Sequence, residues 1–241
     1  MKQTKVANIP LCKFGIFEKY PELIALVTTR TGGVSKGSYS EFNLAFHVLD
    51  KNSNVIRNRE ILANALEISP NDFTCPMQTQ GTNIHIVLED EKGRGSNSWE
   101  DGFPDTDSLV TNVNNIPIAV VTADCAGVFL YDPTNRVIGI VHSGRTGTEG
   151  EIVTKTINKM HDQYRTCTEN LIVGLGPCIH NCCYDIDIPS LINTQLLELG
   201  VRPENIEISD LCTSCNNHIF YSYRADGGRT GRFINLIMLR S

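Results

Sequence analysis

The chain has 241 residues, of which 41% are hydrophobic, and a formal net charge of −6. This acidic balance argues against a nucleic-acid-binding or anionic-membrane surface, and no apolar run approaches the ~20 residues that cross a bilayer. Without a linker or a repeat, the sequence predicts one domain over residues 1–241. The N-terminus lacks the apolar core of a signal peptide, so we expect a cytoplasmic protein whose nine cysteines are reduced thiols.

The first predicted strand spans residues 22–29 and ends in a loop that contains two adjacent glycines. In this loop Arg30, Gly32 and Gly33 place a guanidinium and unhindered backbone N–H groups where an anion could bind. A mobile turn without a ligand is an equally good interpretation of the same residues. Downstream, Ser53 is predicted to cap a helix whose apolar residues recur at three- and four-residue spacing.

Residues 84–88 alternate apolar and polar side chains, which is typical of a strand with one buried face. The polar segment 89–104 contains the only tryptophan, Trp99. It is predicted to be a long loop, with a lid over a site as one interpretation. A short strand over residues 108–111 follows directly after Asp107.

A β-hairpin is predicted at the centre of the chain, where the apolar runs 128–131 and 137–141 flank an Asp-Pro-Thr-Asn turn. If this turn is centred between residues 133 and 134, opposite residues have numbers that sum to 267, which pairs Cys125 with His142. Directly opposite Cβ atoms lie roughly 4.5–5.5 Å apart. This spacing suits a Cys–His dyad or two ligands of one metal ion. A small core cysteine and a hydrogen-bonded histidine are the alternative.

A glycine-containing loop with Gly144 and Arg145 follows the hairpin and leads into a helical pattern. Thr148, with Glu151 three residues later, is predicted to form a capping box at the start of this helix. The free N–H groups and the dipole of a helix N-terminus favour an anion. We therefore predict a phosphate-sized site at this loop, although many strand-to-helix turns use glycine without binding a ligand.

The last part of the chain is predicted to hold a strand at residues 171–173, a helix that starts near Pro189, and a final short helix at 233–239. Cys212 and Cys215 form a C-x2-C pair, which together with Cys178, Cys182 and Cys183 could be a zinc knuckle. Because the two groups do not show paired C-x2-C spacing, a second structural zinc site is not expected. Strands and helices alternate irregularly. This order predicts an α/β or α+β fold, a single layered domain with mixed β-sheets flanked by helices.

Several short motifs along the chain together match one protein family. They are Thr31-Gly32-Gly33-Val34-Ser35, Asn43-Leu44 with His47 and Asp50, Asp107 before a strand, Ala123-Asp124-Cys125, His142-x-Gly144, Gly176-Pro177 with Tyr184, and Thr230-Gly231-Arg232. Through these motifs almost the whole chain resembles the polyphenol oxidoreductase, or laccase-domain, family, whose members are also described as purine nucleoside phosphorylases.

The resemblance implies a laccase-domain-like α/β fold and a His/Cys/His zinc site beside a purine nucleoside pocket. It implies phosphorolysis of adenosine or inosine to the free base and ribose 1-phosphate, with adenosine deamination as a further reaction. The partners would be a nucleoside and phosphate, and the protein a monomer or homodimer. Cys125 and His142 match two zinc ligands, and Asp124 would orient His142 or a substrate group. Substrate or phosphate contacts are predicted for Arg30, Gly32, Gly33, Asn43, Gly144 and Arg145.

Two departures from the family motifs affect this reading. Gln80 stands where a Gln-x-His-Gly motif would supply the first zinc ligand, and an amide oxygen is a much poorer zinc donor than imidazole. We therefore predict a weakened or absent zinc site with Gln80 as its weak third ligand. The family's His-x-Gly-Trp-Arg-Gly segment lacks its tryptophan here, and Arg145 stands one place earlier. Copper is not expected, because one cysteine and one or two histidines cannot build the several copper centres of a laccase.

Three functions are therefore open at this stage. The first is a purine nucleoside phosphorylase, which is a pentosyltransferase. The second is a metal-free hydrolase or deamidase in which Cys125 is the nucleophile and His142 its base. The third is a degenerate paralogue without catalysis that binds a nucleoside or a partner protein. Another histidine, His47 or His85, replaces the lost ligand only if its loop folds over the site.

Overall fold

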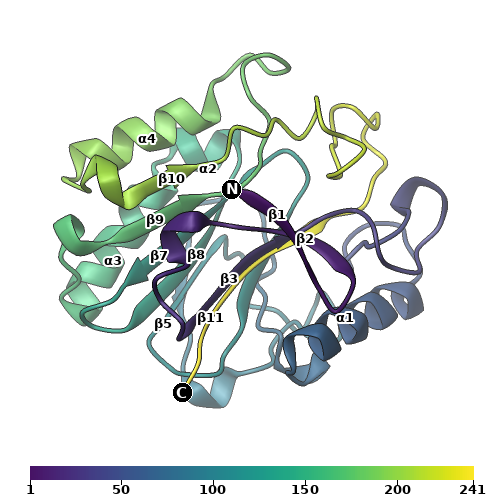
Figure 1. Cartoon of the computed structure of the whole chain (residues 1–241), viewed down its shortest axis with the longest axis horizontal. Helices are drawn as coiled ribbons and strands as arrows, with labels where there is room; N and C mark the ends of the chain where they lie inside the picture. The colour runs from purple at the N-terminus through teal and green to yellow at the C-terminus, as the bar shows by residue number, and fades with distance from the viewer.

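A five-stranded antiparallel sheet forms one half of the central structure (Figure 1). The computed structural model describes residues 1–241. The strand order is β1-β2-β3-β11-β6, and every neighbouring pair is antiparallel. The strands are β1 (Lys2–Val6), β2 (Ile9–Lys13), β3 (Leu23–Thr28), β11 (Phe233–Leu239) and β6 (Ile118–Thr122).

The second sheet has six strands in the order β10-β9-β7-β8-β5-β4. Its outer pairs β10–β9 and β5–β4 are parallel, whereas the inner pairs are antiparallel. The prediction of a mixed sheet is therefore confirmed. The strands are β10 (Ile206–Ile208), β9 (Ile172–Leu175), β7 (Ala126–Asp132), β8 (Val137–Ser143), β5 (Ser108–Thr111) and β4 (Ile84–Ile86).

Helices cover the outer face of each sheet, so the domain has four layers (Figure 1). Helix α1 (Asn52–Leu66) packs on the five-stranded sheet. Helices α3 (Ile152–Tyr164) and α4 (Ile188–Glu198) pack on the six-stranded sheet, and the short α2 (Arg145–Glu149) joins β8 to α3. None of these helices has the length and apolar character needed to cross a membrane.

Strand β7 shows how one apolar run serves two layers. Phe129 and Tyr131 belong to the core between the sheets, whereas Val128 and Leu130 belong to the core beneath α3 and α4. Successive side chains of a strand point to opposite faces. A strand that is buried on both faces therefore reads as a nearly continuous apolar run, as residues 128–131 do.

Three predicted local features are corrected by the structure. The segment Phe233–Leu239 is the buried strand β11 and not a helix; its seven residues are nearly all apolar, and such a short run has no period that separates the two. Helix α1 begins at Asn52, so Ser53 lies within it and does not cap it. The capping box of Thr148 and Glu151 is also absent, because Thr148 lies in α2. The strands at the N-terminus, β1 and β2, were not predicted.

Candidate active site

The central hairpin has a register two residues away from the predicted one. Paired residues of β7 and β8 sum to 269, so Gly127 and not Cys125 lies opposite His142. The connection has four residues, 133–136, and Asp132 Oδ1 accepts hydrogen bonds from two backbone N–H groups within it. Cys125 immediately precedes β7. The slip is an even number of residues, so Cys125 keeps the same face as His142 and becomes its diagonal neighbour.

His142 is held by a buried carboxylate. Its Nδ1 lies 2.7 Å from Asp107 Oδ1, and the Asp107 side chain is fully buried. The backbone N–H groups of Thr79, Gln80 and Gly81 also donate to this carboxylate, at 2.8–3.1 Å. This arrangement fixes the imidazole ring and leaves Nε2 free to act on another group.

The two partners shift each other's ionisation. Burial raises the pKa of Asp107, but the hydrogen bonds and the charge of His142 outweigh this and lower it from its ordinary value. Burial lowers the pKa of His142. The charge of the Cys125 sulfur and the hydrogen bond to Asp107 outweigh burial and raise that pKa to about 9. These interactions favour the protonated form of the imidazole.

A pocket of about 730 Å³ opens beside this pair. It lies between the ends of β6, β7 and β8 and the two long loops near the C-terminus. Its lining includes the predicted Gln80, Asp124, Cys125, His142 and Arg145. The lining also includes residues that the sequence did not single out for the site, namely Gln78, Ile179, Ile188, Tyr223, Arg224, Gly227 and Gly228.

Gly144 leaves room for the thiol of Cys125. A Cβ atom at Gly144 would lie 2.8 Å from Cys125 Sγ and 3.9 Å from Gln80 Oε1. A side chain at this position would force the Cys125 thiol to move, so glycine fits here because it has no Cβ atom. The same distances place the thiol and the Gln80 amide beside one position.

Gln80 does not complete a strong metal site with Cys125 and His142. A catalytic zinc ion usually takes three protein ligands from imidazole, thiolate or carboxylate. His47 lines the same pocket and contacts Trp99 with their rings tilted by 55° and their centroids 4.6 Å apart. Cys125 and His142 do not belong to any group of three or more His, Cys, Asp or Glu side chains whose ligand atoms all lie within 4.8 Å of one another. The residues present therefore do not fit the zinc site that the family implies.

Asp124 supports the pocket through its backbone and its carboxylate. It has a φ of +89°, which is strained for a residue with a Cβ atom. Its Oδ1 accepts a 2.6 Å hydrogen bond from Thr213, and its Oδ2 accepts one of 2.7 Å from the backbone N–H of Arg224. Its carbonyl accepts from Ile179 N at 2.8 Å. Asp124 thus joins the strand that leads to Cys125 to both C-terminal loops, which makes it a positioning residue.

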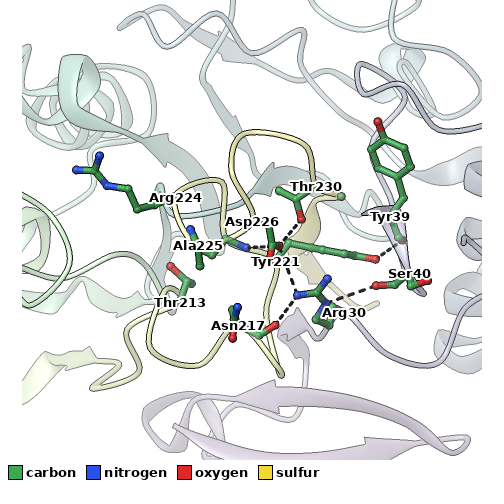
Figure 2. A network of polar contacts seen from close by, with 12 residues as sticks. Arg30, Tyr39, Ser40, Thr213, Asn217, Tyr221, Arg224, Ala225, Asp226 and Thr230 are labelled. Atoms are coloured by element: carbon green, nitrogen blue, oxygen red, sulfur yellow. Dashed lines mark hydrogen bonds and ion pairs between the residues drawn. The ribbon is translucent and has the colours of Figure 1, made fainter. Parts of the chain in front are cut away.

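Arg30 lies outside the lining of the pocket and anchors the loop that carries Arg224 (Figure 2). Its guanidinium pairs with Asp226 at 3.4 Å and lies over the ring of Tyr221, 4.7 Å from the centroid. Thr230 donates a 2.6 Å hydrogen bond to the same Asp226 carboxylate. The predicted phosphate contact by Arg30 is therefore replaced by a structural role.

The other predicted N-terminal contacts also serve the fold. Gly33 has no space for a side chain, since a Cβ atom there would lie 2.5 Å from the carbonyl oxygen of Glu41. Gly32, with a φ of +102°, makes the turn before it. Asn43 is fully buried and donates to Asp50 at 3.0 Å. None of the three predicted contacts lines the pocket.

Arg145 reaches the rim of the pocket, but the loop around it differs from the prediction. Helix α2 begins at Arg145 itself and has five residues. The Arg145 guanidinium pairs with Asp185 at 2.9 Å and with Glu149 at 3.3 Å. The hydroxyl of Thr148, expected to cap a helix, lies 2.8 Å from that of Ser143.

Four cysteines from two separate loops meet beside the pocket wall. The sulfur atoms of Cys182, Cys183, Cys212 and Cys215 all lie within 4.8 Å of one another, and this cluster could hold a metal ion. Paired C-x2-C spacing does not describe this cluster, because it does not consist of two such pairs. The structure instead combines one such pair with two adjacent cysteines.

Sequence reasoning also did not assign Asp107 its role as the partner of His142. Asp107 was noted only as part of a family motif before a strand. Its position could have been inferred because β5 follows it directly and lies beside β8, the strand that carries His142. Tyr223 and Arg224, by contrast, reach the pocket on a basic, glycine-rich loop whose sequence does not indicate where it folds.

Comparison with known proteins places this geometry in a family. A sequence profile described as "Multi-copper polyphenol oxidoreductase laccase" matches residues 24–187 and 185–240. Purine nucleoside phosphorylase YlmD of Geobacillus stearothermophilus is 30% identical over 244 residues, which cover 89% of each chain. A purine nucleoside phosphorylase of Corynebacterium glutamicum is 31% identical, covering 88% of this chain and 92% of its own.

A solved structure agrees over nearly the whole fold. The crystal structure of YlmD from Geobacillus stearothermophilus matches with a TM-score of 0.94 at 27% sequence identity, over 99% of this chain and 98% of that one. The profile covers more than half of the chain, and the agreement includes both sheets and their helices. The chain therefore belongs to the laccase-domain family, whose curated relatives include purine nucleoside phosphorylases.

Proposed function

We propose that the pocket cleaves inosine or adenosine with inorganic phosphate, giving the free base and ribose 1-phosphate. The observation that carries this proposal is that one pocket of about 730 Å³ holds Cys125, the Asp107-supported His142 and three arginines. This volume is within the range of small-molecule sites. The names of the relatives support the same reaction.

The arginines supply a binding surface for phosphate. Arg145, Arg224 and Arg232 all line the pocket, and their planar guanidinium groups match phosphate oxygens in pairs. Arg224 lies over the ring of Tyr184, 5.2 Å from its centroid, and Arg232 lies 5.7 Å from the centroid of Tyr223. These aromatic contacts help to position both guanidinium groups, and Arg232 Nη1 is further fixed by donating to the carbonyl oxygens of Thr230 and Gly231, each at 2.9 Å.

His142 is placed to assist the departure of the base. Its protonated imidazole can donate a proton from Nε2 to a purine nitrogen as the glycosidic bond breaks. Asp107 stabilises the imidazolium and fixes the ring orientation. The tyrosine rings of the pocket offer flat surfaces to the purine. Adenosine deamination is a second reaction to assay in the same pocket.

The test of this function is a phosphate-dependent assay. Purified protein with inosine and phosphate is expected to release hypoxanthine and ribose 1-phosphate in equal amounts, measured by chromatography. Without phosphate, release should stop, because the second substrate is missing. Base release that does not depend on phosphate, or no release with inosine and adenosine, would contradict the proposal.

Gln80→His is expected to raise zinc affinity at the pocket. The substitution supplies imidazole beside Cys125 and His142 and so gives the three protein ligands that a catalytic zinc ion uses. We expect tighter zinc binding by calorimetry. Gln78→His, in the same pocket lining, is the matched control. The assignment of ligands is wrong if Gln80→His leaves the affinity of the Cys125–His142 pair for zinc unchanged.

The rate of phosphorolysis is expected to fall as pH rises through about 9. The folded-state pKa of His142, about 9, is above its ordinary value of 6.5. The interactions of the His142 imidazolium with Asp107 and Cys125 are therefore fully present below about pH 6.5, and they are lost as pH rises through the folded-state pKa and the imidazolium loses its proton. A profile of kcat/KM against pH should show this basic limb. In Asp107→Asn the fall in kcat/KM should begin at a lower pH. If it does not move, the fall reports the ionisation of a group other than His142.

One observation favours a second candidate, a metal-free hydrolase or deamidase. Asp107, His142 and Cys125 form an acid–base–thiol series. Because Gln80 stands where the family has a zinc-binding histidine, the Cys125 thiol is available as a nucleophile. In this case an acyl-enzyme on Cys125 would form with amide substrates without phosphate. Release of ammonia from a panel of amides, lost in Cys125→Ser, separates this reaction from phosphorolysis.

A further inference from the structure

The four-cysteine cluster has the dimensions of a tetrahedral sulfur site. Cys215 Sγ lies 3.5 Å from Cys182 Sγ and 3.4 Å from Cys183 Sγ, and all four sulfurs, including that of Cys212, lie within 4.8 Å of one another. With a Zn–S bond of about 2.3 Å, tetrahedral geometry separates the ligands by roughly 3.8 Å. The cluster needs only a small adjustment to reach this spacing.

The backbone holds the two loops together before any ion binds. Cys178 and Cys212 form a parallel bridge, and Thr213 N donates to Cys178 O at 2.9 Å. At the C-x2-C turn, Asn216 donates to the carbonyl oxygen of Cys212 through both its backbone N–H, at 3.0 Å, and its side-chain amide, at 2.8 Å. Cys183 N donates to His180 O at 3.0 Å. The ligands therefore come from two braced turns.

Core packing does not account for these residues. A cysteine without a role in chemistry is usually a small buried hydrophobic residue. Cys182 and Cys215 are exposed and Cys183 is only partly buried, so three of the four gain little from burial. Four thiols that converge at the surface, from loops far apart in sequence, are typical of a structural metal site.

We propose that Cys182, Cys183, Cys212 and Cys215 bind one structural zinc ion as four thiolates, with release of the thiol protons to solvent. Zinc is the ion that best matches an all-sulfur tetrahedral set in a chain whose cysteines are reduced. This site is separate from the Cys125–His142 pair, with which it shares no ligand.

The ion would brace one wall of the pocket. Tyr184, which lines the pocket, directly follows Cys183. Thr213 directly follows Cys212 and donates the 2.6 Å hydrogen bond to Asp124. Zinc would thus tie together the two segments that position Asp124 and the aromatic wall. Its binding does not depend on which reaction the pocket performs.

The test is metal content of the protein purified under reducing conditions. We expect one zinc per chain in the unmodified protein, in Cys167→Ser and in Cys125→Ala. Cys167 is an exposed cysteine outside the cluster, and Cys125→Ala removes the other thiol that could bind an ion. The double variant Cys182→Ser/Cys215→Ser should lose the zinc. X-ray absorption at the zinc edge should show four sulfur neighbours at about 2.3 Å.

A conservative variant keeps the test informative if the double variant does not fold. Cys215→His preserves a four-ligand site of the three-thiolate, one-imidazole type and should retain zinc. X-ray absorption on the unmodified protein requires no variant at all. The proposal is overturned by reduced, folded protein without zinc, by iron in its place, by disulfides between these cysteines under reducing conditions, or by loss of the zinc in Cys125→Ala.

Discussion

His142→Ala is expected to lower kcat/KM for inosine phosphorolysis by about 10²–10⁴-fold, the usual contribution of a positioned acid–base group. The substitution removes the only imidazole that Asp107 supports and with it the proton for the departing base. It also leaves the buried Asp107 carboxylate with only the backbone N–H groups of residues 79–81 and the Thr79 hydroxyl as partners. The measurement is steady-state kinetics with inosine and with phosphate varied separately.

His85→Ala is the matched control for this prediction. His85 lies on β4, stacks on Phe103 with ring centroids 4.1 Å apart, and pairs with Glu91 at 2.9 Å. It lies outside the lining of the pocket. Its loss should leave the kinetics unchanged. If folded His142→Ala has an unchanged kcat/KM, His142 has no catalytic role in this reaction, whatever the control shows.

Phe129→Ala is expected to lower the free energy of unfolding by about 3–5 kcal/mol. Phe129 is fully buried on β7, in the core between the sheets, and meets Phe14 edge to face with ring centroids 4.9 Å apart. Removing the ring opens a cavity between two sheets whose backbones are fixed by hydrogen bonds and cannot collapse into it. A loss of this size is a large share of the ~5–15 kcal/mol that stabilises a typical domain.

Urea unfolding followed by circular dichroism measures the effect of Phe129→Ala. The midpoint should fall while the slope stays constant, since the surface exposed on unfolding is nearly the same. Leu49→Ala is the control, because Leu49 is 85% exposed and its loss should change the free energy by less than about 0.5 kcal/mol. A similar loss in both variants would contradict the assigned core.

The sequence predicted secondary structure correctly where the signal lies within one element. It failed where the conformation depends on pairing with distant strands. The apolar run 128–131 predicted a buried strand because its length and its flanking turn residues leave few alternatives. The run Phe233–Leu239 is equally apolar, but it has no turn signal of its own. Its strand conformation follows from pairing with β3 and β6, which are distant in the chain.

The same limit applies to the site. The proximity of Cys125 and His142 could be predicted because both belong to one hairpin, and even the wrong register kept them on one face. The placement of Arg30 could not be predicted, because the loop that contains Asp226 returns to it from nearly two hundred residues away. The four-cysteine cluster depends in the same way on two loops whose meeting no local spacing encodes.

The position of β11 also determines when the domain can form during translation. β3 and β6, separated by about ninety residues, pair only through β11, which is made after both of them. Until the ribosome has released Phe233–Leu239, β3 and β6 each expose an unpaired edge. The core between the sheets then also lacks the apolar side chains that β11 contributes. The nascent chain therefore needs protection from aggregation, and a stalled product that ends before residue 233 should be recognised by proteases and not accumulate.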